Sequence, residues 1–345
     1  MDSRNPLTSR SGTQEPNAIP LYISGATKLV PTAMIPFDFY RVRLGLRADE
    51  ALRFPTPAAN LLRGALGWWL KASQPGEDYA RWFRPRRPSA DEGAQPTLSA
   101  GPMPSGLADW PRPFVLRASH LDGVERGPGE CWSFDVHIFA REALWPLVRA
   151  LAGAAEHGIG AGRIRSKLAS IEALDLEGGT GSSLCSGGAS SLDVFHRLKP
   201  VLPIRLNLAD TGEQAGDVSL RFVTPTELKG QGCSGREPDF AVLFARLRDR
   251  LSNLAALYGA GPLPVDFRAL GERARQVRLR HARLDWERAE RRSSRTGQVH
   301  PLGGFTGEAE YEGDLGEFLP WLAAARWVGV GRQTVWGKGD VRVVR

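Results

Sequence analysis

The most regular pattern in the chain lies in residues 37–46, where apolar and basic side chains alternate. Val42 and Leu44 follow Arg41 and Arg43 in turn. A period of two predicts a β-strand with one apolar face and one basic face. We expect the apolar face to pack on a core and the basic face to lie opposite it.

Similar patterns divide the chain into two halves with the same order of elements. In the first half we predict strand, helix, strand, strand, helix and strand over residues 37–46, 57–72, 114–117, 131–138, 142–156 and 163–173. In the second half the same order falls on residues 217–224, 240–258, 278–291, 305–311, 315–325 and 340–345. This βαββαβ order is the split-βαβ arrangement. The predicted fold class is therefore α+β, with tandem ferredoxin-like, RRM-like domains.

A glycine- and serine-rich stretch, GGTGSSLCSGGASS at residues 178–191, separates the two halves. It has little apolar surface to bury, which is typical of a linker. The first twenty residues are polar and proline-containing, and they do not resemble a signal peptide. We expect four parts, namely a flexible tail 1–34, an N-terminal ferredoxin-like domain 35–176, a linker 177–191 and a C-terminal ferredoxin-like domain 192–345. With no apolar run long enough to cross a bilayer, we expect a cytoplasmic protein without membrane contact.

The charge balance indicates a polyanionic partner. The formal net charge is +7, and only six of the 45 Lys and Arg residues are lysine, so 39 are arginine. Arginine binds phosphate through a planar fork and stacks on bases, which favours nucleic acid. A GC-rich coding sequence is the alternative explanation for so many arginines. The three cysteines have no CxxC spacing, so neither a disulfide framework nor a structural zinc site is expected.

A glycine-rich loop, GVGRQTVWGKG at residues 329–339, precedes the last predicted strand. Its glycines bring backbone amides close to a ligand, and successive amides can hold a phosphate. The tryptophan offers a face for a base, and two cations add charge. A plain glycine-rich turn is the alternative, whereas the Rossmann and P-loop patterns do not fit. The candidate RNA-binding residues of the loop are Gly329, Gly331, Arg332, Gln333, Trp336 and Lys338.

A second basic segment, WERAERRSSRTGQVHPLGGFTG, covers residues 286–307. Clustered arginines and serines suit a bent RNA backbone, although a solvated strand edge is the alternative. Its candidate RNA-binding residues are Arg288, Arg291, Arg292, Arg295 and His300. Among the other histidines, His157 lies beside the first glycine loop, and the rest are interpreted as structural. No HxxxH, HExxH or GxSxG pattern occurs, so we expect no metal and no common hydrolase site.

Three groups of segments resemble the repeat-cleaving endoribonucleases of CRISPR systems, which belong to the RAMP superfamily. The closest runs from RRSSRTGQ and GGFTG through FLPWLAAA into VGVGRQTVWGKG. The others are RFVTPTELKG with a helix ending LAALYG, and PGECWSFDVHIFA with a helix and GIGAGR. Together they cover most of residues 37–345.

The resemblance implies tandem ferredoxin-like domains that hold a CRISPR repeat RNA, often a hairpin, across a basic cleft. It implies cleavage of the precursor into guide RNA without metal or other cofactor. The ribose 2′-OH attacks the adjacent phosphate and leaves a 2′,3′-cyclic phosphate and a 5′-OH. The product then stays bound in an effector complex with other Cas subunits.

Many members of this family have a catalytic histidine in or near the first helix. This sequence has no histidine before His120, so it departs from that pattern. Either arginines and a tyrosine carry catalysis, or the protein only binds RNA. We favour the first, with Arg41, Arg43 and Arg63 clamping the phosphate and Tyr40 exchanging a proton.

The resemblance also assigns RNA binding to Lys71 on the first helix, and to His157 and Arg163 around GIGAG. Two alternatives to the nuclease remain. One is a non-catalytic subunit that caps a guide RNA in an interference complex. The other is a backbone subunit of such a complex, against which the C-terminal glycine loop argues.

Overall fold

A computed structural model describes residues 34–73, 77–85, 110–160, 162–185, 201–228, 237–287, 290–292, 299–301 and 303–344. These residues belong to one compact unit, Ala33–Arg345. The tail predicted over residues 1–34 lies, up to residue 33, outside the described part of the chain.

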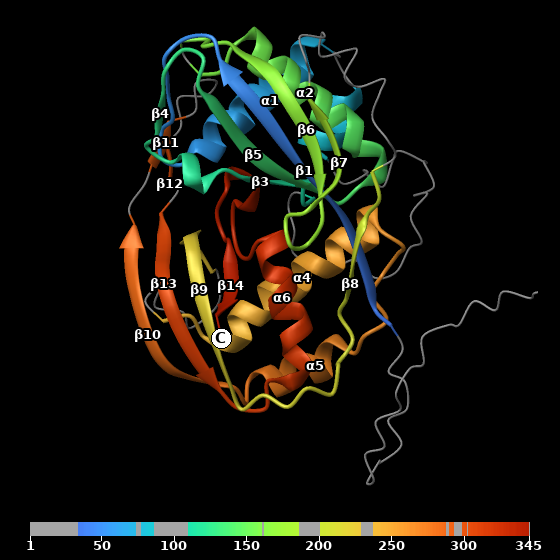
Figure 1. Cartoon of the computed structure of the whole chain (residues 1–345). Helices are drawn as coiled ribbons and strands as arrows, with labels where there is room; N and C mark the ends of the chain where they lie inside the picture. The colour runs from blue at the N-terminus through green and yellow to red at the C-terminus, as the bar shows by residue number, and fades with distance from the viewer. Residues whose placement is uncertain are drawn as a thin grey trace, which may run out of the picture. The chain divides into compact units, whose positions relative to one another are not determined.

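The N-terminal half contains a four-stranded ferredoxin-like core. Its elements are β1 (Pro36–Ala48), α1 (Ala58–Ser73), β3 (Phe114–Arg117), β5 (Cys131–Ile138), α2 (Leu144–His157) and β6 (Ser166–Leu174). The strand order is β3-β5-β1-β6, and every pair is antiparallel. This is the order of a split βαβ unit, with the first and third strands in the centre. Helices α1 and α2 pack together over one face of this sheet (Figure 1).

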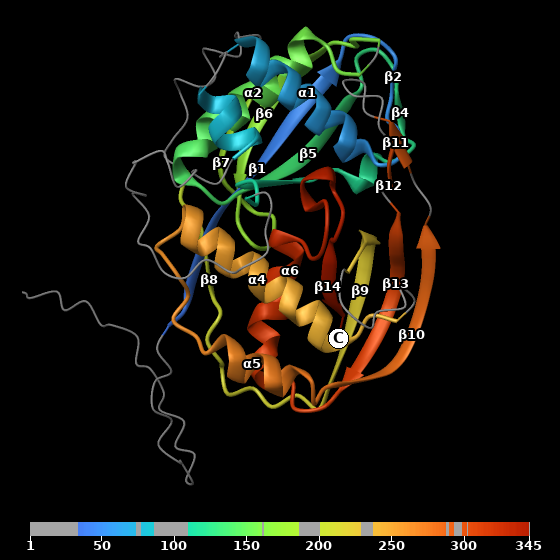
Figure 2. The ribbon, with the colours of Figure 1, turned by 180° about the vertical axis from the view of Figure 1, so that it is seen from behind.

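The C-terminal half repeats the arrangement. Its elements are β9 (Asp217–Thr226), α4 (Phe240–Tyr258), α5 (Phe267–Ala274), β10 (Arg278–Glu287), β13 (Gly304–Glu312), α6 (Leu319–Val328) and β14 (Val341–Val344). The strand order β10-β13-β9-β14 is the counterpart of the N-terminal order, and it is again antiparallel. Helices α4 and α6 contact each other beside this sheet (Figure 2). The predicted duplication of the ferredoxin-like fold is confirmed.

Several elements were not predicted. Part of the expected linker is a strand, β7 (Thr180–Cys185), which pairs with β6, so the linker prediction is wrong for these residues. Strand β8 (Ile204–Asn207) extends the same sheet by pairing with the start of β1. The short strands β2 (Leu52–Arg53) and β4 (Glu125–Arg126) pair with each other. Helix α5 escaped prediction because it has few apolar residues, and its N-terminus is fixed by the Asp266 carboxylate.

Strand β1 contributes to the hydrophobic cores of both halves. Val42 and Leu44 are fully buried in the N-terminal core, as their alternation predicted. On the opposite face, Phe39 is fully buried in the C-terminal core, and its ring lies 5.3 Å from that of Trp327 in α6. One strand therefore ties the N-terminal sheet to the helix that leads into the glycine-rich loop.

The C-terminal end of α6 is held by side chains from three other elements. Arg117 in β3 donates to the carbonyl of Arg326 at 2.7 Å, and His137 in β5 hydrogen-bonds that of Trp327 at 2.9 Å. Two further donors complete the set, because Arg250 Nε in α4 donates to Val328 O and Gly329 N donates to Ala325 O. The last four carbonyls of a helix lack partners within it, and here all four are bonded.

His137 generates a prediction about acid stability. Burial lowers its pKa to about 3, and the nearby charge of Arg117 adds to this effect. An unfolded histidine has a pKa of about 6.5, so the contribution of neutral His137 is complete above that pH and is lost as pH falls toward 3. Between pH 6.5 and pH 4.5 we expect the free energy of unfolding to fall by about 2.7 kcal/mol because of His137, which is about 1.36 kcal/mol for each pH unit.

Urea unfolding at several pH values between 7 and 4.5 measures this slope. His137→Gln is expected to be less stable at pH 7 but to have a flatter dependence on pH. His281→Gln, at an exposed position on β10, is the matched control and keeps the wild-type slope. Equal slopes for wild type and His137→Gln would contradict the assignment.

Candidate functional site

The glycine-rich loop, residues 329–339, uses most of its amides for its own fold. Val330 N donates to Gly339 O at 2.9 Å, and Arg332 N donates to Glu227 O at 3.1 Å. The loop amides that donate to protein carbonyls are those of Gly329, Val330, Arg332, Trp336, Gly337 and Gly339. These groups are not available to a phosphate. The predicted amide cradle is therefore replaced by a closely packed loop.

Lys338 is enclosed within this loop, with 1% of its surface exposed. Its Nζ donates to Glu227 Oε2 at 3.3 Å, Gly303 O at 2.6 Å and Gln333 Oε1 at 3.0 Å. Burial lowers the pKa of Lys338, while the Glu227 carboxylate opposes that change. All three ammonium protons are used, so we correct the predicted RNA contact of Lys338 to a role in holding the loop. Arg332 binds the other Glu227 oxygen at 2.7 Å but remains half exposed.

The loop packs directly on helix α1. Gly337 has φ of +84°, and a Cβ atom there would lie 2.6 Å from the Cβ of Ala59. Next to it, the Arg63 guanidinium lies 5.0 Å from the Trp336 ring and 4.7 Å from the Phe83 ring. Arg63 is 9% exposed. It therefore packs between two aromatic rings, and Trp336 gives one face to protein rather than to a base.

A cavity of about 380 Å³ lies where the loop meets α1, and we call it the loop pocket. Its walls come from the start of α1, the turn Ser119–Leu121, the ends of β9 and β10, and the loop. Its ionisable side chains are His120, Asp122, Glu287 and Lys338. The pocket thus brings charged groups from both halves of the chain together.

Asp122 and His120 are each fixed by a backbone group. Asp122 Oδ1 accepts from Ala58 N at 2.7 Å and so caps α1. The pKa of Asp122 is raised, mainly by burial and further by Glu287, against the opposing effects of the Ala58 bond and His120. His120 Nε2 lies 2.8 Å from Ser133 O. Asp122 therefore lies within electrostatic range of both His120 and Glu287.

The basic face of β1 carries an arginine–carboxylate cluster. Asp135 Oδ2 accepts from Arg41 Nη2 at 2.9 Å, and Asp135 Oδ1 accepts from Arg43 Nε at 2.7 Å. Burial would raise the pKa of Asp135, but the two arginines outweigh it and hold that pKa below its usual value. Arg41 is further bound to Asp175 O and is 11% exposed at its side chain, whereas Arg43 is 37% exposed. Arg43 is thus the member of the pair that reaches solvent.

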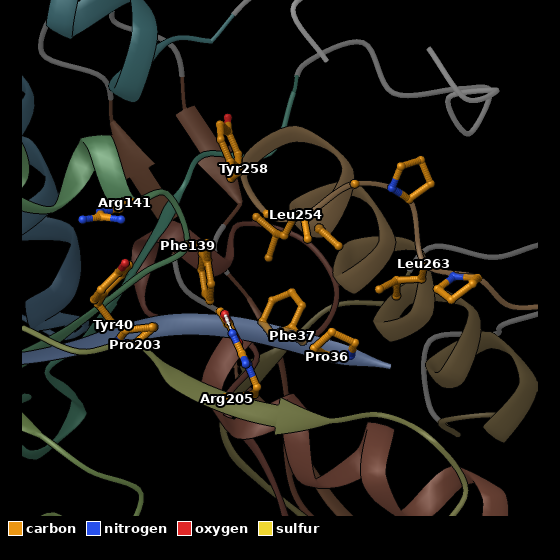
Figure 3. Close-up of a pocket in the computed structure, with 17 residues that line it drawn as sticks. Pro36, Phe37, Tyr40, Phe139, Arg141, Pro203, Arg205, Leu254, Tyr258 and Leu263 are labelled. Carbon is orange, nitrogen blue, oxygen red and sulfur yellow. Dashed lines mark hydrogen bonds and ion pairs between the residues drawn. The ribbon is translucent and has the colours of Figure 1, made fainter. Parts of the chain in front are cut away.

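Tyr40 lies on the other face of β1, in a separate cavity of about 460 Å³. Figure 3 shows its hydroxyl pointing toward Arg141, with Phe139 nearby. Burial raises the pKa of Tyr40. The four predicted catalytic residues therefore do not form one site. Tyr40 faces this cavity, Arg41 and Arg43 bind Asp135, and Arg63 packs beneath the loop.

Three predicted RNA-binding residues gather at the far end of α1. The Arg163 guanidinium lies 4.9 Å from the ring of Trp68, which is 43% exposed, and the His157 ring lies 4.1 Å from that of Trp69. Lys71 is exposed one turn beyond Trp68. We call this group the tryptophan patch. It is separated from the loop pocket by most of α1, about 20 Å at 1.5 Å per residue.

Three of the remaining predicted RNA-binding residues, Arg291, Arg292 and His300, fall on a small hairpin. Strand β11 (Glu290–Arg292) pairs with β12 (Val299–Pro301), and this places Arg291 opposite His300, with Arg292 opposite Val299. The prediction of one strand over residues 278–291 is thereby divided, because β10 ends at Glu287. Arg288 and Arg295 lie outside the described residues. The predicted RNA contacts of this segment stay predictions.

Sequence reasoning missed His120, Asp122 and Glu287. In a βαββαβ unit the end of the second strand lies at the same edge of the sheet as the start of the first helix. His120 follows the predicted strand 114–117 by three residues, so its position beside α1 was available from topology. Its local sequence gave no such signal. Glu287 lies in an arginine-rich stretch, and its local sequence likewise gave no indication that it is near α1.

The described residues contain neither a metal-binding cluster nor a membrane-spanning helix. No group of three or more His, Cys, Asp or Glu side chains within them is placed to hold a metal ion. Among the helices of this part of the chain, none is long and apolar enough to cross a membrane.

The contact between loop and helix predicts the effect of Gly337→Ala. The added methyl group meets Ala59 and also occupies a backbone conformation that favours glycine. We expect it to lower the unfolding free energy by about 1–3 kcal/mol, as overpacking does. Chemical denaturation measures this change. The control is Gly64→Ala in α1, where an added Cβ meets nothing within 4 Å. Because alanine favours a helix over glycine, this variant is expected to raise the free energy of unfolding by about 0.5–1 kcal/mol.

Comparison with known proteins gives matches in both halves. Residues 220–341 match the model of the CRISPR-associated endoribonuclease Cas6 family, and residues 37–195 match a family model described as an N-terminal domain. The product complex of the Cas6 protein TTHB231 shares 20% identity over 90% of this chain and 100% of that one, with a TM-score of 0.52.

Two further structures are similar. The product complex of the Cas6 protein TTHA0078 shares 18% identity over 90% of this chain and 100% of that one, with a TM-score of 0.49. Thermus thermophilus Cas6 (TTHB231) shares 16% identity over 90% of this chain and 99% of that one, with a TM-score of 0.48. No curated protein sequence matches. The family match covers residues 220–341, which include the glycine-rich loop, and the fold is similar to that of TTHB231. Both findings support the resemblance to Cas6-type CRISPR-associated endoribonucleases found in the sequence.

Proposed function

We propose that this protein binds CRISPR repeat RNA and cuts it once, by attack of a ribose 2′-OH on the adjacent phosphate without a metal ion. The observation that carries the proposal is the loop pocket. It forms where the glycine-rich loop of the Cas6-matching segment packs on α1, and it opens beside ionisable groups of both halves. The products are a 2′,3′-cyclic phosphate and a 5′-OH.

The basic face of the N-terminal sheet supplies a path for the RNA backbone toward this pocket. Ser133 and Asp135 are two positions apart in β5 and so share a face. Ser133 O contacts His120 at the pocket, and Asp135 holds Arg43 farther along. Arg43 and His120 thus both contact β5, two residues apart, and we propose that the RNA backbone passes from Arg43 toward the pocket.

Arginine suits one part of this chemistry and not the rest. Its guanidinium stays charged and stabilises the negative charge that develops on the phosphoryl oxygens. It is a poor proton acceptor, so removal of the 2′-OH proton falls to another group. We therefore assign Arg43 to charge stabilisation and positioning.

The tryptophan patch extends the proposed RNA surface. Trp68 is exposed, and base–aromatic stacking contributes about 1–3 kcal/mol per base. Arg163 and Lys71 add positive charge beside it. We propose that this patch holds part of the repeat away from the cut, such as a hairpin. TTHB231 was solved as a product complex, and we extend product retention, in an effector complex with other Cas subunits, to this chain.

A cleavage assay in EDTA tests the proposed function. The pure protein is incubated with an end-labelled repeat RNA, and one cut is expected because the nucleophile is part of the substrate. Deoxyribose at the nucleotide before the cut removes that nucleophile and should abolish cleavage while binding persists. Binding of the all-ribose RNA without any cut would contradict the nuclease and support the guide-capping subunit.

Substitution of Arg43 tests the basic face. We expect Arg43→Ala to slow cleavage about 10–100-fold, because a hydrogen bond to a charged group contributes about 1.5–3 kcal/mol. Single-turnover rates measure the effect. The control is Arg278→Ala, because Arg278 is an exposed arginine at the start of β10 and forms an ion pair with Glu312.

Arg63→Ala is expected to act through the loop, so it should lower thermal stability and cleavage together. Unchanged cleavage in both Arg43→Ala and Arg63→Ala would overturn the assignment of these arginines.

A further inference from the structure

The proposed cleavage needs two proton transfers, and the described arginines serve neither. One group must take the proton of the attacking 2′-OH, and another must give a proton to the departing 5′ oxygen. Among the described side chains of the loop pocket, His120, Asp122 and Glu287 have the right chemistry. Asp122 is committed to capping α1 through Ala58 N. This leaves His120 and Glu287.

His120 is oriented by its hydrogen bond to Ser133 O. A carbonyl oxygen only accepts, so Nε2 carries the hydrogen in this contact. The other ring nitrogen, Nδ1, then remains to exchange a proton with a substrate. His120 is exposed and lines the pocket, so the ring is accessible to RNA.

Glu287 reaches the same pocket from the opposite half of the chain. It is the last residue of β10, and its Oε1 accepts from Thr306 Oγ1 at 3.0 Å on the neighbouring strand. Within the described residues this bond holds one carboxylate oxygen, Oε1, and we assign Oε2 to the substrate. Glu287 and His120 both line the loop pocket together with Asp122, so the two groups converge there from different halves of the chain.

The pocket volume also suits this use. A cavity of about 380 Å³ lies within the range of about 300–1,000 Å³ that is typical of ligand pockets. It is bounded by the loop and by the N-terminus of α1, and its volume is enough for one nucleotide and its phosphate. His120 comes from the N-terminal half and Glu287 from the C-terminal half, so both halves are needed to form this pair.

We propose that Glu287 is the general base and His120 the general acid of RNA cleavage; this assignment rests on the proposed function. Glu287 takes the 2′-OH proton as the O2′–P bond forms, and the imidazolium of His120 gives its proton to O5′ as the P–O5′ bond breaks. The products are a 2′,3′-cyclic phosphate and a 5′-OH. Glu287 is left protonated and His120 neutral, and exchange with water restores both.

A substrate with sulfur in place of the bridging 5′ oxygen separates this role from a structural one. A thiolate leaves without protonation, so loss of the general acid no longer matters. His120→Gln keeps a donor for Ser133 and is expected to cut the all-oxygen RNA about 100-fold or more slowly than wild type. It should cut the sulfur-containing RNA within threefold of the wild-type rate. Glu287→Gln should be slow on both substrates.

The controls separate failure of this inference from failure of the proposed function. His281→Gln, exposed on β10, should match wild type on both RNAs. If His120→Gln is equally slow on both substrates, or slow on neither, His120 is not the general acid. If Glu287→Gln cuts either RNA at the wild-type rate, Glu287 is not the base. If the wild-type protein cuts no RNA at all, the proposed function falls, and this assignment with it.

Discussion

The position of the loop pocket depends on how the C-terminal end of α6 is bonded. Its last four carbonyls accept hydrogen bonds from Arg117, His137, Arg250 and the amide of Gly329. Arg117 and His137 belong to the N-terminal sheet, so this sheet supplies the partners that a helix end in the C-terminal half requires. Cations also suit the negative end of a helix dipole. The bonds fix where α6 ends, and the glycine-rich loop begins at the next residue.

The loop then completes the junction by packing rather than by binding an anion. Glu227 holds Lys338 and Arg332 on one side, and Gly337 touches Ala59 of α1 on the other. Because the loop lies against α1, the ends of β9 and β10 are brought to the turn that follows β3, and the loop pocket forms between them. The glycines are needed for close approach and for positive φ, which are mechanical requirements. The chemical groups come from the neighbouring segments.

The sequence predicted the repeated fold more accurately than the site. Alternation in β1 and helical spacing in α1 and α4 report burial directly, so these elements were found within one or two residues. Composition misled where a different interaction decided the structure. The glycine–serine stretch contains β7 because its backbone pairs with β6, which needs no apolar side chains. Lys338 was expected to contact RNA, but it is buried and paired with the Glu227 carboxylate, and nothing in the local sequence shows that Glu227 is near.

Several arginines have buried structural roles that do not concern RNA. Arg41 binds Asp135 and Asp175, Arg63 packs between aromatic rings, and Arg117 and Arg250 cap α6. The planar guanidinium serves these buried tasks because it donates several hydrogen bonds and stacks on rings. Such residues raise the net charge without being placed to meet a phosphate. In the proposed function, the positive charge that meets RNA is therefore carried by exposed arginines such as Arg43 and Arg163, and the proton transfers fall to side chains of other types.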